Sequence, residues 1–440
     1  MIRRVRGAVL MGMLAALPPP ARAQDRPRPA GEPLQLAVLQ REALASDPRT
    51  RELTLTADET ALRIRNLEVE RRPFVSTLAQ SQYQSDVPTP PALVPGGRPL
   101  FQPPKDTYDV SVRVDQRLID PSLEPRIALA RAGLAESQAH LRTTLFAIRD
   151  EVNEAFFTAA LLQEQIGALQ ATLGDLEARL RETAARVREG AALASDASAI
   201  EATLLQQRQQ DDELRANRTA ALARLSQLTG RAIPDEAELA MPDLDAKVAD
   251  ARGGLDAVRA RPEYAQFDRA RDRVARQQDL SIAADRPQLS AFGRAGYGKP
   301  GLNFINEGFD SYALAGIQLQ WKTWSWGTAA RERDALRLQQ EAVGAEEAAF
   351  TARLKRVVQN DLAAIDRLQR SLADDERIIA LRAGVDRTTR ARFREGAVTA
   401  SESLDRTNEW LAAQFARARH RVERAQAQAR LLTTLGLEVQ

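Results

Sequence analysis

Residues that could support catalysis or bind a metal are scarce in this chain of 440 residues. It contains no cysteine, which excludes disulfides, thiolate zinc sites, iron–sulfur clusters and a cysteine nucleophile. The only histidines, His140 and His420, are two isolated imidazoles that cannot build a metal site, so we expect both to be solvated. We find no nucleophile elbow, phosphate-binding loop or paired-carboxylate cleft. The sequence therefore predicts no catalytic residue, no cofactor and no metal.

The most distinctive polar residues surround two short turns. The pattern Arg-x-Arg-Glu-Gly-Ala occurs at residues 186–191 and again at 392–397. Gly190 and Gly396 are suited to ending a helix with a positive φ angle. Glu402 and Asp405 follow the second turn. One interpretation is that they are ordinary acidic residues in the first turn of a helix, where the helix dipole stabilises negative charge.

These two turns belong to an internal duplication. Residues 186–230 align without gaps to 392–436 at an offset of 206, and Pro48 and Pro73 match Pro262 and Pro287 at an offset of 214. We therefore expect a first structural repeat over 24–233 and a second over 257–440. Pro234, Pro242, Gly253 and Gly254 favour a linker over 234–256.

The first 23 residues have the pattern of an export signal. Three arginines precede a short apolar stretch from Val9 to Leu17, and Ala21-Arg22-Ala23 is a small-x-small cleavage pattern. Removing this signal peptide (1–23) changes the formal charge from +2 to −2, because it carries four arginines and no acid. The basic pI is therefore no argument for nucleic-acid binding, and we expect no nucleic-acid partner.

Each repeat contains the same predicted order of elements: a helix (44–70; 257–283), a strand, a turn-rich loop, a second strand, a very long helix, the glycine turn and a return helix. In the first repeat apolar or small residues recur at heptad spacing for more than six repeats, from Leu141 to Val187. A helix over 122–189 would be about 100 Å long, so a compact domain has no room for it.

The predicted strands alternate apolar and polar residues. In 108–115 one face holds Tyr108, Val110, Val112 and Val114, and the other holds Asp109, Ser111, Arg113 and Asp115. Strands are also expected over 74–83, 288–298 and 312–321. Trp321, Trp324 and Trp326 cluster where the last strand ends. They fit an aromatic girdle at a membrane interface or a plug between packed helices, and we favour the girdle.

Strands of about ten residues are long enough to cross a bilayer when tilted. Four strands cannot close a barrel, and open edges in lipid leave backbone groups unpaired. If the strands span a membrane, several copies must pool them, and three copies supply twelve. A soluble periplasmic coiled-coil adaptor or scaffold protein is the alternative, although an adaptor should have one hairpin and a small β domain.

With these features the sequence resembles the TolC family of trimeric outer-membrane efflux and secretion ducts. The resemblance rests on the duplication, the strand–loop–strand order before each long helix, and the helix–glycine turns. It implies an α+β membrane protein with long antiparallel coiled-coil hairpins and four β-strands per protomer, pooled in a homotrimer as a twelve-stranded barrel and an α-helical tunnel. The resemblance implies that the protein is located in the outer membrane of a Gram-negative bacterium, with outer-membrane lipid around the barrel and a large part of the protein in the periplasm.

The resemblance also implies a function and site residues. The chain would be the channel subunit of a tripartite efflux or type I secretion system, docking a periplasmic adaptor (membrane fusion protein) and an inner-membrane pump. The tip turns at Gly190 and Gly396 would engage the adaptor, and the acidic ring of the aperture would fall on Glu402 and Asp405. The gate would fall on Asp196 and Phe393, whereas Val398 stands where the family has an arginine, which Arg392 or Arg394 could replace. The exported substrate and the energy source of the pump are not encoded in these features.

Overall fold

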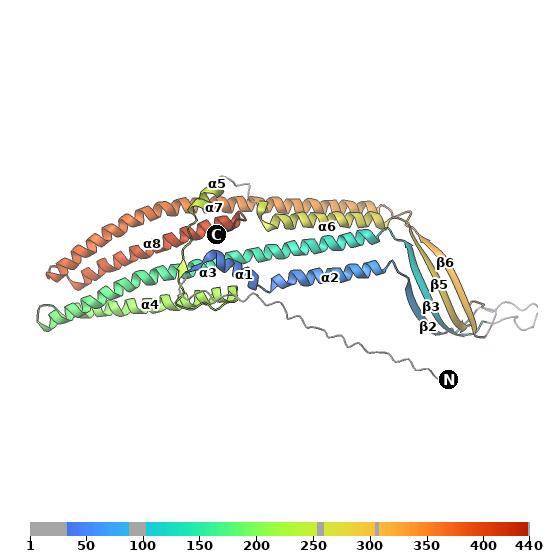
Figure 1. Cartoon of the computed structure of the whole chain (residues 1–440), viewed down its shortest axis with the longest axis horizontal. Helices are drawn as coiled ribbons and strands as arrows, with labels where there is room; N and C mark the ends of the chain where they lie inside the picture. Colours follow the sequence, from blue (N-terminus) through green and yellow to red (C-terminus); the bar gives the residue numbers. More distant parts are fainter. Residues whose placement is uncertain (1–32, 88–102, 253–258, 304–307, 439–440) are drawn as a thin grey trace, which may run out of the picture.

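The structure is a computed structural model that describes residues 33–87, 103–252, 259–303 and 308–438. The predicted export signal and most of the proline-rich loop between the first two strands lie outside the described residues. The described part is elongated, with a four-stranded sheet at one end and two helical hairpin tips at the other (Figure 1). None of the described helices is long and apolar enough to cross a membrane.

The same order of elements occurs twice along the chain. The first set comprises α1 (Leu36–Ser46), α2 (Arg49–Val69), β2 (Phe74–Tyr83), β3 (Asp106–Ile119), α3 (Leu123–Arg188) and α4 (Ala194–Thr229). The second set comprises α6 (Pro262–Ala284), β5 (Gln288–Lys299), β6 (Asp310–Gln320), α7 (Thr328–Arg394) and α8 (Ala400–Thr434). The long helices α3 and α7 contain 66 and 67 residues, so each is about 100 Å long, as the heptad pattern predicted.

Two matched prolines mark where α2 and α6 begin. The single helix expected over 44–70 is two helices, because Asp47 is extended (φ −67°, ψ 125°) and separates α1 from α2. A residue before proline avoids the α region, so Pro48 interrupts the helix. Pro262 lies in the first turn of α6, which starts there rather than at the expected residue 257.

The four longer strands form one sheet in the order β2–β3–β5–β6, and all neighbouring pairs are antiparallel. Their bounds follow the predictions, except that β3 extends beyond 108–115 at both ends. The register keeps the predicted apolar positions on one face, since Val112 lies opposite Ala295 and Ala295 lies opposite Ala313. Strands β2 and β6 are the two edges of the sheet.

The main apolar core lies midway along the molecule, where α1, α3, α4, α6, α7 and α8 meet. Phe156 and Phe157 of α3 are buried in it, with their rings edge to face at 5.3 Å. The expected linker is partly folded into this core, because it contains β4 (Leu239–Ala240) and α5 (Asp245–Arg252). β4 pairs in parallel with β1 (Leu34–Gln35), and Leu244 and Val248 are buried. Apolar residues in this segment, rather than its prolines and glycines, determine that placement.

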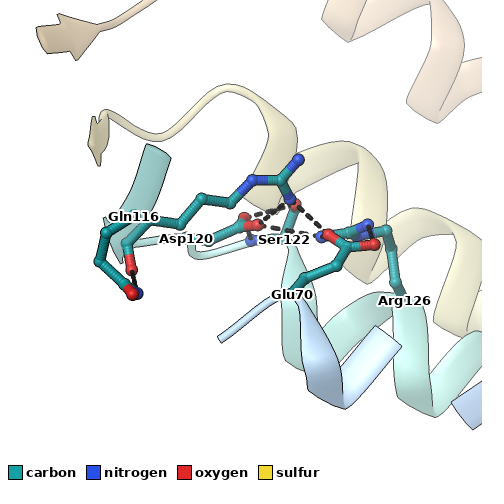
Figure 2. A network of polar contacts seen from close by, with 6 residues as sticks. Glu70, Gln116, Asp120, Ser122 and Arg126 are labelled. Atoms are coloured by element: carbon teal, nitrogen blue, oxygen red, sulfur yellow. Dashed lines mark hydrogen bonds and ion pairs between the residues drawn. The ribbon is translucent and has the colours of Figure 1, made fainter. Parts of the chain in front are cut away.

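A polar network fixes β3 to the helices where the sheet meets them (Figure 2). Asp120 accepts hydrogen bonds from the backbone nitrogen (3.0 Å) and the hydroxyl (2.6 Å) of Ser122. Arg126 pairs with both Asp120 (2.9 Å) and Glu70 at the end of α2 (2.8 Å). Burial raises the pKa of Asp120, but hydrogen bonds from Ser122 and Arg117 outweigh burial, so this pKa is lowered. The network therefore favours a charged carboxylate and a fixed position of the sheet on the helices.

Candidate functional site at the helical tips

Both hairpins turn through the same backbone motif. Gly190 ends α3 with φ 71°, and Gly396 ends α7 with φ 76°. At each tip the alanine after the glycine donates its N–H to the carbonyl of an arginine five residues earlier, at 2.8 Å. This is the Schellman arrangement, in which a left-handed residue satisfies the last carbonyls of a helix. The two duplicated sequence motifs therefore give two nearly identical tips, which lie side by side (Figure 1).

A cavity of about 460 Å³ lies between the two tips and is lined by residues of both turns. Asp196, Phe393 and Val398 are all among the lining residues. The fold thus brings together residues of two halves that are about 200 positions apart in the sequence. Both residues predicted for the gate border this one cavity, as does the valine at the predicted arginine position.

The residues predicted for the gate contact different partners. Oδ1 of Asp196 accepts a hydrogen bond from the backbone N–H of Ala400 at 3.4 Å, where the N-terminus of α8 favours negative charge. Phe393 packs against an apolar cluster that includes Ile200 and Leu404. Of the two arginines considered as replacements, Arg394 instead approaches Glu182 of α3 at 3.5 Å. Asp196 therefore joins the two hairpins through a backbone contact within one protomer.

Glu402 and Asp405 are exposed at the start of α8. The backbone N–H of Glu402 donates to Oγ1 of Thr399 at 3.2 Å, which caps the helix. Within the described residues neither carboxylate forms an ion pair. Both acids are therefore presented to solvent next to the tip, and neither is needed to pair a neighbouring charge.

A partly buried charged network near the tips was not predicted. Arg179 of α3 contacts Asp175 (2.6 Å), and Arg390 of α7 contacts both Asp175 (2.9 Å) and Asp386 (2.6 Å). Thr407 of α8 donates to Asp386 at 2.8 Å and accepts from Arg179 at 3.1 Å. The network therefore joins α3 to α7 and α8, so it links the two hairpins.

The side chains of this network are largely removed from water. Asp386 is 3% exposed, and the Arg179 side chain is 11% exposed. Burial, followed by the nearby Arg390 charge, lowers the pKa of Arg179 despite the opposing effect of Asp175. A signal in the sequence could have revealed the network. Asp386 stands in a heptad seam at the position matched by Leu180 in the first hairpin.

At the other end of the molecule, the predicted apolar strand face is solvent-accessible in the protomer. Tyr108, Val110, Val112 and Val114 are 43, 57, 45 and 38% exposed, while Ser111 on the opposite face is buried. Trp321, Trp324 and Trp326 are 57, 74 and 80% exposed just after β6. The rings of Trp324 and Trp326 meet edge to face at 5.9 Å. These indoles lie on the surface of the protomer rather than between its helices.

The two histidines have different surroundings. His140 lies on α3 with Gln266 3.4 Å from its Nδ1. His420, which we expected to be solvated, is only 22% exposed and its Nδ1 lies 2.7 Å from Oδ2 of the buried Asp375. The reason is that His420 faces α7 across the seam of the second hairpin. Among the described residues no group of three or more histidines and acids is placed to hold a metal ion.

The protomer thus combines two long helical hairpins with an open four-stranded sheet at the end opposite their tips. The profile of the family described as "Outer membrane efflux protein" matches residues 39–231. This match confirms the predicted resemblance to the TolC family. None of the curated proteins compared with the chain matches it.

Solved structures share the fold over almost the whole chain. CusC, whose structures concern folding and transmembrane channel formation, is 15% identical with a TM-score of 0.68, covering 92% of each chain. The MtrE outer membrane channel of Neisseria gonorrhoeae, in its open state, is 18% identical with a TM-score of 0.65, covering 92% of this chain and 89% of MtrE. The outer membrane protein VceC of Vibrio cholerae is 13% identical with a TM-score of 0.67, covering 92% and 97%.

The comparisons confirm the predicted fold class, a helical tunnel joined to a barrel formed by pooled strands. The chain is an outer-membrane efflux channel subunit with a large helical periplasmic part. Outer membrane efflux proteins are channels that work as trimers with an adaptor and an inner-membrane pump. The alternative of a soluble periplasmic adaptor is not favoured. An adaptor should have one hairpin, whereas this protomer has two hairpins and four long strands.

Proposed function

We propose that three copies of this chain form a passive exit duct through the outer membrane and periplasm, gated at the helical tips. The observation that carries this proposal is the sheet, whose edge strands β2 and β6 have no further strand beside them among the described residues. An open edge in lipid costs several kcal/mol for each unpaired backbone group, and four strands are too few to close. Three sheets of four strands joined edge to edge would close as a barrel of twelve.

The exposed apolar face of the strands would then contact lipid. Tyr108, Val110, Val112 and Val114 alternate with polar residues that would line the water-filled lumen. Trp321, Trp324 and Trp326 follow β6 on the side of the helices and are largely exposed. Because indoles favour the membrane–water interface, these residues would mark the periplasmic boundary of the outer membrane.

The opposite end of the duct would form the aperture. Threefold assembly would bring six carboxylates, from Glu402 and Asp405 of each copy, around one axis. Such a ring favours cations and slows anions. Asp196 and Phe393 border the cavity between the tips, so they would respond when the two hairpins move relative to each other.

The tips themselves would be the docking site for the adaptor. The turns at Gly190 and Gly396 are the parts of the protomer furthest from the sheet (Figure 1). The inner-membrane pump would supply the energy and choose the cargo, within an efflux or a type I secretion system. The N-terminal 23 residues would direct export and be removed.

A conductance measurement tests the acidic ring. In planar bilayers we expect the double variant Glu402→Ala with Asp405→Ala to lose most of the preference for cations over anions. The matched control is Asp212→Ala with Glu213→Ala, two exposed acids of α4 far from the tip. Equal selectivity in both double variants would contradict the acidic ring.

Membrane fractionation and native mass spectrometry test the assembly itself. We expect the full chain in the outer-membrane fraction, released by detergent as a trimer. Recovery as a monomer in the soluble periplasm would contradict the proposed duct.

A further inference from the structure

We infer that α2 of one copy packs antiparallel against the membrane-proximal half of α7 of the next copy, with leucines of α2 seated on an alanine stripe of α7. This inference rests on the trimer of the proposed function. It adds which two helix faces meet and in which register.

The order of the helices identifies the two surfaces. Near the sheet, α2 contacts α3, α3 contacts α6, and α6 contacts α7. This order repeats the strand order β2–β3–β5–β6. Figure 1 shows α2 and α7 as the outer members, with α3 and α6 between them. If β6 of one copy joins β2 of the next, α7 and the neighbouring α2 must also become neighbours.

Helix α2 has two apolar stripes, and only one is used within the protomer. The partly buried stripe includes Leu53, Ile64 and Leu67, and lies on the side that packs on α3. Leu55, Leu62 and Val69 form the other stripe at a spacing of seven residues. They are 54, 56 and 54% exposed. Apolar residues at heptad spacing on one face are typical of a seam that packs on another helix, so this face lacks its partner in the protomer.

Helix α7 has the complementary arrangement in its first half. Leu336, Val343 and Phe350 are buried or partly buried and lie on the side that packs on α6. A second stripe at alternating steps of three and four residues is exposed and made almost entirely of alanine. It consists of Ala335, Leu338, Ala342, Ala345 and Ala349. Small residues in such a stripe leave holes into which larger side chains of a facing helix can insert.

Ion pairs between neighbouring helices fix the relative height of these two stripes. Arg71, just after α2, pairs with Glu124 of α3. Further along α3, Glu136 pairs with Arg273 of α6 at 2.5 Å. Arg271, half a turn away on α6, pairs with Glu347 of α7. Because neighbouring helices are antiparallel, counting residues from one pair to the next identifies positions of α2 and α7 at the same distance from the sheet. Positions at the same distance from the sheet are said to lie at the same height.

The result is a match between large and small residues. Leu62 of α2 lies at the height of Ala342 of α7. One heptad further from the sheet, Leu55 lies at the height of Ala349. Each exposed leucine of one edge thus meets an alanine of the other edge, which is the complementarity that close packing of two helices needs. Two leucine stripes or two alanine stripes would not give this fit.

Disulfide cross-linking of paired cysteines tests the interface directly, because the natural chain contains no cysteine. We expect Leu62→Cys with Ala342→Cys, and separately Leu55→Cys with Ala349→Cys, to form covalent dimers and trimers on mild oxidation of the detergent-solubilised protein. A disulfide forms when the two Cα atoms are about 4.4–6.8 Å apart. All four residues are exposed in the protomer, so the substitutions leave its core intact.

A matched control moves one cysteine to the other face of α7. In Leu62→Cys with Val343→Cys, the second thiol lies on the side that packs on α6, so we expect at least tenfold less cross-linked product. Native mass spectrometry of the reduced samples separates the possible failures. Trimers without cross-links in either test pair would overturn this interface and leave the duct intact. Monomers in the unsubstituted chain would overturn the duct itself.

Discussion

The two hairpins of this protein have the same shape but different interiors. In the first hairpin the long helix α3 presents an apolar seam, with Ala155 and Leu169 buried and Leu180 partly buried. At the matched offset of 206, the second hairpin has Asp361, Asp375 and Asp386. These three acids are only 1, 7 and 3% exposed. The duplication therefore kept the heptad geometry and changed its chemistry in one copy.

Each buried acid of α7 has a basic partner. Asp361 pairs with Arg430 of α8, Asp375 lies 2.7 Å from His420, and Asp386 contacts Arg390 at 2.6 Å. A buried charge is tolerated only when it is paired and hydrogen-bonded. The buried acids and the basic groups that pair with them are therefore concentrated in the seam of the second hairpin.

The largest effect should come from moving an acid into the first hairpin. We expect Leu169→Asp to lower the free energy of unfolding by about 5 kcal/mol, because the position matching His420 is Leu214 and offers no partner. Denaturant unfolding of the purified trimer measures this loss. The reverse change, Asp375→Leu, should cost much less, because it removes one hydrogen-bond partner of His420 and adds no buried charge. If both variants behave alike, the two seams do not differ in the way described.

Breaking the network between the hairpins should have the next largest effect. We expect Asp386→Ala to cost about 3 kcal/mol, because the partly buried guanidinium groups of Arg179 and Arg390 are left to share Asp175. Hydrogen exchange should show the loss as faster exchange in the tip halves of α7 and α8. Asp374→Ala removes an exposed acid of the same helix and serves as the control. Equal exchange in the two variants would rule out a stabilising role for the network.

The pH response should separate the hairpins further. Burial raises the pKa of Asp361 from 3.8, and the hydrogen bond and charge of Arg430 offset only part of this rise. Oδ2 of Asp361 has no hydrogen-bond partner among the described residues. A raised folded-state pKa means that the stabilising contribution is full below 3.8 and is lost as pH rises through the folded-state value.

We therefore expect Asp361→Asn to gain stability over the natural chain as pH rises from about 4 to 7, by on the order of 1 kcal/mol. Melting temperatures of both proteins across this range measure the difference. Ala155→Ser in the first hairpin adds no titratable group and should show no such trend. A difference that stays constant with pH would contradict the assignment to Asp361.

The smallest effect should be the same in both hairpins. Gly190→Ala and Gly396→Ala should each cost about 1 kcal/mol, since alanine is disfavoured at the φ angles of 71° and 76° found there. Gly167→Ala, inside α3 with open space around it, should be neutral or slightly stabilising. Unfolding measured under one condition compares all three. Unequal losses at the two tips would show that the tips differ in more than sequence.

Much of the fold followed from local patterns. The period-two alternation identified all four long strands, and the heptad pattern identified α3 and α7, because each side chain's face is set by backbone geometry alone. The split at Pro48 was missed because the apolar residues around it continue the helical pattern. The buried Asp375 and Asp386 were missed because an acid in a seam has no local signature of its partner.

The sequence by itself determined which segments are helices and strands, where the tips turn, and that the chain contains an internal duplication. The helices, strands and turns depend on residues within a few positions of one another, and the duplication is visible in the residue order alone. Only the tertiary structure decided that Asp196 contacts the start of α8, that α3, α7 and α8 share a partly buried charge network, and that α2 and α7 are the free edges. Those contacts join residues up to 228 positions apart, and they exist only because the two long helices are packed in register.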